Sequence, residues 1–166
     1  MAHNDYRGGG SYGNARPQFE DNPPVEIKSF YDADGNVKIE LFDSTAKKVA
    51  ESFVGTNKNG KDIGVSSTQL RRIFDEVKRY KRVLASSNVK WEDQLPYIKM
   101  IKSKVAYTVA RAAKQKSEEE KVYKNLESFI SQGINLVKSQ KDYKVFVSLF
   151  EAAYGFYYEL APSSAK

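Results

Sequence analysis

Residues 67 to 84 read STQLRRIFDEVKRYKRVL, and this stretch decides the fold class. Apolar side chains recur in it at steps of three and four residues. At 100° per residue these positions fall within about 80° of a helical surface, so they form one narrow stripe. The pattern predicts an amphipathic helix that begins near residue 66 and ends near residue 86. The stripe consists of Leu70, Ile73, Val77, Tyr80 and Leu84.

A localised block of positive charge surrounds this helix. Residues 61 to 116 hold 14 Lys and Arg against 5 Asp and Glu, a net of +9, whereas the whole chain carries +6. Runs of charge are often only a solvated helix face. Here the few acidic residues cannot pair with so many basic ones inside the block. The excess therefore predicts a polyanionic partner, and nucleic acid is the commonest one for a folded basic domain.

The cations of the block follow the helical repeat in two rows. One row lies opposite the apolar stripe of residues 67 to 84, and the other lies on a long helix predicted over residues 91 to 116. In the second row Tyr107 stands among cations, which suits a stacked base beside a phosphate track. We predict that these rows contact nucleic-acid phosphates. The candidate nucleic-acid-binding residues are Arg71, Arg72, Lys78, Arg79, Arg82, Lys104, Arg111 and Lys114.

Three further helices are predicted on either side of these two. A short helix follows Asp43 and reaches about residue 54, and residues 55 to 60 form an exposed loop after it. Ser117 is expected to cap a fourth helix, in which Gly133 indicates close packing. The connections are short, which favours antiparallel neighbours. The predicted fold is all-α, a compact bundle of about five helices.

The fifth predicted helix, residues 141 to 160, is unusually aromatic. Tyr143, Phe146, Phe150 and Tyr154 are joined by further rings in its last turns, so apolar groups occur nearly all round it. One face alone cannot bury them. We expect one side of this helix in the core and the other at a subunit contact, so self-association is predicted.

Four regions are expected along the chain. Residues 1–24 form a disordered tail with an RGG-like segment, because this composition cannot bury enough apolar surface to offset its ordering entropy. Residues 25–42 form an extended or hairpin segment around an Asp-Gly turn. Residues 43–160 form the helical bundle, and residues 161–166 form a frayed C-terminal tail.

The composition argues against most kinds of catalytic and metal-binding sites. The chain has no Cys, and its single His is His3, so thiolate sites, a His-based triad and a multi-His zinc site are excluded within one chain. It has no nucleotide-binding glycine motif, and its acidic residues lie on charged helix surfaces. We expect no catalytic residue, metal or cofactor. No apolar run is long enough to cross a membrane, so a cytoplasmic protein without a membrane partner is expected.

Four motifs resemble the small subunit of the type III-A CRISPR Csm effector complex. They are STQLRRI at residues 67–73, LPYI at 95–98, KVAY at 104–107 followed by Arg111, and EAAYGFYY at 151–158. The resemblance covers roughly residues 45 to 160. It does not extend to the segment before residue 43.

The resemblance implies a non-enzymatic helical subunit of an antiviral ribonucleoprotein. Several copies would stack along the complex beside other Csm subunits, and basic residues would help to hold the guide RNA and target RNA. That role would fall on Arg71, Arg72 and Arg111, which lie in the matching motifs. Target cleavage and cyclic-nucleotide synthesis in such complexes belong to other subunits.

Two other functions are compatible with the same residues. The helix of residues 67–84 could enter a DNA major groove, although the long loop before it is unlike a helix-turn-helix pair. Alternatively, the chain could be a protein-interaction adaptor that works through its aromatic last helix, with the basic block docking onto an acidic partner.

Overall fold

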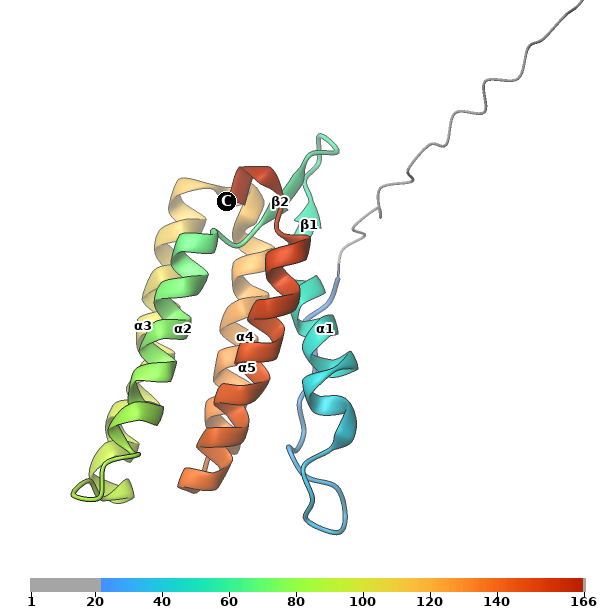
Figure 1. The fold of residues 1–166 in the computed structure, drawn as a ribbon. Helices are drawn as coiled ribbons and strands as arrows, with labels where there is room; N and C mark the ends of the chain where they lie inside the picture. The colour runs from blue at the N-terminus through green and yellow to red at the C-terminus, as the bar shows by residue number, and fades with distance from the viewer. Residues whose placement is uncertain (1–21, 166) are drawn as a thin grey trace, which may run out of the picture.

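The computed structural model describes residues 22–165 and shows an all-α bundle with one small β-ribbon at one end (Figure 1). The predicted fold class is confirmed, and each helix lies close to its predicted range. Much of the predicted tail, residues 1–21, lies outside the described residues. The helices are α1 (Ser44–Ser52), α2 (Ser67–Val83), α3 (Trp91–Gln115), α4 (Glu120–Leu136) and α5 (Gln140–Leu160).

Helix α5 lies between α1 and α2, while α3 packs mainly on α4 (Figure 1). Helices that follow one another from α2 to α5 run in opposite directions, as short connections require. The stripe of α2 that was identified from its spacing is buried, and Leu70 and Val77 are fully enclosed. The basic face of α2 is therefore left on the outside of the bundle.

Aromatic rings of α5 fill the centre of the core. Tyr143, Phe146 and Phe150 are fully buried, and the ring of Phe129 on α4 contacts both Phe146 and Phe150. The helix begins with a capping box, in which the Ser139 hydroxyl accepts from the backbone N–H of residue 142. The predicted core side of α5 is thus confirmed, and its subunit contact stays a prediction.

The prediction of an exposed loop over residues 55 to 60 was partly wrong. Strands β1 (Val54–Thr56) and β2 (Asp62–Gly64) form an antiparallel ribbon, and the turn between them uses the positive φ of Gly60, 72°. Strands of three residues are too short to show an alternating pattern, which is why the sequence did not reveal them.

The start of the fourth helix also differs from the prediction. Ser117 makes no side-chain capping bond. Instead, the single 3₁₀ turn η2 (Ser117–Glu119) leads into α4. The acidic residues of this turn still lie at the positive end of the helix dipole.

Residues 22–38 form a segment without helix that lies along the bundle, and hydrogen bonds join it to α1, α4 and the start of α5. Only one β-bridge forms in it, between Tyr31 and Val37, around a turn in which Gly35 has a φ of 79°. The 3₁₀ turn η1 (Ile39–Phe42) follows. Ile27 and Phe30 are buried in the core, so this segment covers part of the bundle.

Residues 161–165, where we expected a frayed tail, lie against the ribbon. The 3₁₀ turn η3 (Ser163–Ala165) buries Ala165, and the ring of Pro162 packs on Gly64. Within the described part of the chain, no helix is both long and apolar enough to span a bilayer.

Candidate nucleic-acid interface

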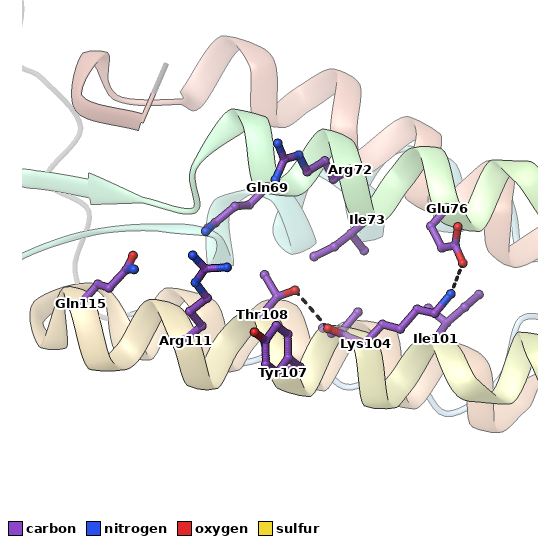
Figure 2. A pocket seen from close by; sticks show the side chains of 11 residues that line it. Gln69, Arg72, Ile73, Glu76, Ile101, Lys104, Tyr107, Thr108, Arg111 and Gln115 are labelled. Carbon is purple, nitrogen blue, oxygen red and sulfur yellow. Dashed lines mark hydrogen bonds and ion pairs between the residues drawn. The ribbon is translucent and has the colours of Figure 1, made fainter.

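A groove with a volume of about 480 Å³ lies between α2 and α3 (Figure 2). Its α2 side begins near the first turn of that helix, and its α3 side extends to the last turn of α3. Cations, neutral polar groups and apolar side chains all contribute to it. The lining residues are Gln69, Arg72, Ile73, Glu76, Ile101, Lys104, Val105, Tyr107, Thr108, Arg111 and Gln115.

The floor of the groove is apolar. Ile73 from α2 and Ile101 and Val105 from α3 are nearly or fully buried there. These residues belong to the core-facing stripes of the two helices. The groove therefore forms where the stripes meet the polar faces, and one amphipathic pattern accounts for both its floor and its rim.

One end of the groove is held by a carboxylate with two cationic partners. The Glu76 carboxylate accepts hydrogen bonds from Arg79 Nε and Nη2, each at 3.1 Å, and from Lys104 Nζ. These bonds, first of all those from Arg79, hold the pKa of Glu76 below its ordinary value, although partial burial opposes the shift. Glu76 is therefore ionised near neutral pH and offsets part of the charge of its two partners.

The other end of the groove carries uncompensated positive charge. Arg111 extends from α3 across the groove toward Gln69, and Arg72 lies next to Gln69 on α2 (Figure 2). Among residues 22–165, no carboxylate lies within ion-pair distance of Arg72 or Arg111. Both side chains are exposed, so their donors are available to an anionic ligand.

Two other candidate cations of α2 face α5 instead. Lys78 Nζ lies 2.9 Å from the Glu151 carboxylate, and Arg71 lies 3.8 Å from Asp75. Arg71 also lines a smaller cavity of about 200 Å³ beside Tyr158. The row of cations at residues 71, 78 and 82 is therefore on a different side of α2 from the groove.

The remaining candidates, Arg82 and Lys114, are exposed and lie outside the groove. The structure thus brings together Arg72, Lys104 and Arg111, with Arg79 joined to them through Glu76. Contact of any of the eight candidates with RNA stays a prediction.

Comparison with known protein families identifies the family of this chain. A family model described as Csm2 Type III-A matches residues 36–159. This chain belongs to the Csm2 Type III-A family. The resemblance found in the motifs is confirmed, and Csm2 membership makes the chain a structural small subunit of a type III-A CRISPR effector complex, associated with other Csm subunits. Searches of the curated proteins and of the solved structures found no significant match.

Several lining residues of the α2–α3 groove were missed in the sequence. Gln69, Thr108 and Gln115 are neutral, so charge counting did not reveal them. Their spacing contains a usable signal, because they flank the buried stripes at steps of three and four residues. The Gln69 side chain is also held in place, since its Oε1 accepts a hydrogen bond from the Tyr123 hydroxyl of α4.

Proposed function

We propose that this chain is a non-catalytic, RNA-binding scaffold subunit of its Csm complex. It contacts the backbone of guide RNA and target RNA through the α2–α3 face, and it is present in several copies per complex. The observation that carries the proposal is the pair of exposed arginines, Arg72 and Arg111, which no carboxylate within residues 22–165 neutralises.

The chemistry of these groups suits a ribose-phosphate backbone. Guanidinium groups bind phosphate through paired N–H donors, and each neutralised phosphate releases condensed counterions. Such contacts carry no sequence information. In an RNA-guided complex the sequence is read by base pairing, so a subunit that holds only the backbone is sufficient.

The adaptor alternative has less support. It would need the rings of α5 as a working surface, but Tyr143, Phe146, Phe150 and Tyr157 are buried. Tyr158 is the one large apolar side chain of α5 that is mostly exposed, at 75%. A single ring is a small surface for a protein partner.

A salt titration of RNA binding tests the proposal. Arg72→Ala with Arg111→Ala should weaken binding of a short RNA duplex by roughly tenfold at low salt. The slope of log affinity against log salt should also become less steep, by about 1.8, because two phosphate contacts are lost.

The matched control removes two cations elsewhere. Lys47→Ala with Lys48→Ala takes the same charge from exposed positions of α1, across the bundle from the groove. This variant should keep most of the affinity and nearly the same slope. Equal losses in the two variants would mean that only net charge matters, and the proposed surface would be wrong.

A further inference from the structure

The α2–α3 groove has features that a purely phosphate-binding surface does not need. Phosphate groups require cations and N–H donors, which an open basic face supplies. This groove instead has a floor made by Ile73, Ile101 and Val105. Its volume of about 480 Å³ lies within the range of small-molecule pockets. We infer that it is a subsite for the base of one unpaired RNA nucleotide.

The distribution of polar groups fits a planar base attached to a phosphate. Arg72 and Arg111 lie at the end of the groove near Gln69 (Figure 2), and both are exposed, so the backbone of a bound nucleotide would remain in solvent there. The amides of Gln69 and Gln115 line the same region, and an amide can donate to or accept from the edge of any base. The apolar floor would contact the flat face of the ring.

Tyr107 supplies an exposed aromatic ring at the groove. Its side chain is 69% exposed although it lines the cavity, and it lies on α3 one residue before Thr108 (Figure 2). An exposed ring beside cations is suited to stacking on a base. Stacking tolerates all four bases, so the subsite would not select a sequence.

The nucleotide must be unpaired for this subsite to be used. Inside an A-form duplex the bases are stacked and their faces are inaccessible, whereas single-stranded or bulged nucleotides can place a base in a protein groove. This inference rests on the proposed RNA-binding function and refines it. It predicts that the protein prefers RNA in which a base is free.

Binding of three matched RNA duplexes to the full-length chain tests the inference. The first is fully paired, the second carries one extra unpaired 2-aminopurine nucleotide, and the third carries an abasic nucleotide at the same position. We expect the second to bind roughly tenfold tighter than the other two, from stacking of one base. The fluorescence of its 2-aminopurine should be quenched on binding.

Two variants test whether the preference for an unpaired base depends on the groove. Thr108→Phe fills the groove, and Tyr107→Ala removes the ring. Either should abolish the preference for the 2-aminopurine duplex over the fully paired one, and the quenching with it. The preference is a ratio of two affinities, so a loss of affinity shared by all three duplexes does not change it. Tyr107→Phe should keep both signals. Ser103→Phe is the matched control for Thr108→Phe, because both hydroxyls donate to a backbone oxygen of α3 but Ser103 lies outside the groove.

The outcomes separate this inference from the proposed function. If the wild type binds all three duplexes equally, while Arg72→Ala with Arg111→Ala weakens all of them, the base subsite is wrong and RNA binding stands. Tight binding of the abasic duplex, or a preference that survives both groove variants, would also overturn the subsite. If the double arginine variant changes nothing, the proposed function fails and the inference fails with it.

Discussion

The ring of Phe146 occupies the space that a methyl group on residue 133 would need. A Cβ built at Gly133 would lie 2.1 Å from Cε2 of Phe146, far inside van der Waals contact. Phe146 is fully buried and in ring contact with Phe129 and Phe150, so it has little room to shift. The absence of a side chain at residue 133 therefore sets how closely α4 and α5 approach.

Gly133→Ala should lower the free energy of unfolding by about 1 to 3 kcal/mol, since overpacking of the core outweighs the better helix propensity of alanine. Urea unfolding followed by circular dichroism measures this. Gly155→Ala is the matched control, because Gly155 lies in α5 with no atom within 4 Å of its added Cβ. That variant should be stabilised by about 0.5 to 1 kcal/mol. Stabilisation of both variants would contradict the packing account.

The charge balance of the groove can be altered through Glu76. Glu76→Gln frees Lys104 and Arg79 from their carboxylate partner, so we expect RNA affinity to rise several-fold at low salt and its salt dependence to steepen. Glu151→Gln frees Lys78 on the α5 side of α2 in the same way, and it should have little effect if RNA binds at the groove. Anisotropy titrations at two salt concentrations measure both. A larger gain in RNA affinity for Glu151→Gln would indicate that RNA binds on the opposite side of α2.

Tyr31 and Asp142 couple the N-terminal segment to the start of α5. The Tyr31 hydroxyl donates to Asp142 Oδ1 at 2.8 Å, and burial together with this carboxylate raises the pKa of Tyr31 to about 12. Because the folded pKa exceeds the ordinary value of about 10, the stabilisation is complete below pH 10. It is lost as the pH rises from about 10 through about 12.

Tyr31→Phe should therefore cost about 1 kcal/mol of unfolding free energy at pH 7 and less above pH 10. The phenyl ring keeps the position over which Lys141 Nζ lies, 5.0 Å from the ring centre, so the change isolates the hydroxyl. The difference between wild-type and variant tyrosinate absorbance, followed with pH, should titrate near 12. A difference that titrates near 10 would show that Tyr31 is neither buried nor bonded to Asp142 in solution.

Gln132 of α4 binds the backbone of the N-terminal segment at two atoms. Its Oε1 accepts from the N–H of Ile27 at 2.8 Å, and its Nε2 donates to the carbonyl of Val25 at 3.0 Å. Gln132→Ala should remove both bonds and accelerate amide hydrogen exchange at Ile27 and Phe30, with a global loss of about 1 to 2 kcal/mol. Asn135→Ala, an exposed change on the same helix, is the control. Unchanged exchange at Ile27 in the Gln132 variant would contradict the role of this side chain.

The helices and their buried faces could be predicted because the required information is local. Leu70 and Val77 lie one helical repeat apart, and burial followed directly from that spacing. The fit between Gly133 and the neighbouring helix was also predicted, since a glycine inside a strong helical pattern usually has a packing reason. In these elements propensity, patterning and tertiary packing agree.

The features that the sequence did not reveal depend on contacts between distant parts of the chain. Lys78 and Glu151 are 73 residues apart, so charge counting within one block could not show that Lys78 is neutralised. Gln132 and Ile27 are 105 residues apart, and nothing near residue 27 indicates what holds it. The groove itself needs two helices, so its neutral lining residues become recognisable only when α2 and α3 are placed side by side.

The segment held by Gln132 also bears on how this protein should be divided for experiments. The family model matches this chain from residue 36 onward, but Ile27 and Phe30, which precede that match, are buried in the core of the bundle. Truncation at residue 36 would remove both side chains and expose the apolar surface that they cover, which favours aggregation. A fragment for binding experiments should therefore begin at or before residue 22. Loss of RNA binding by a shorter fragment could result from its instability alone.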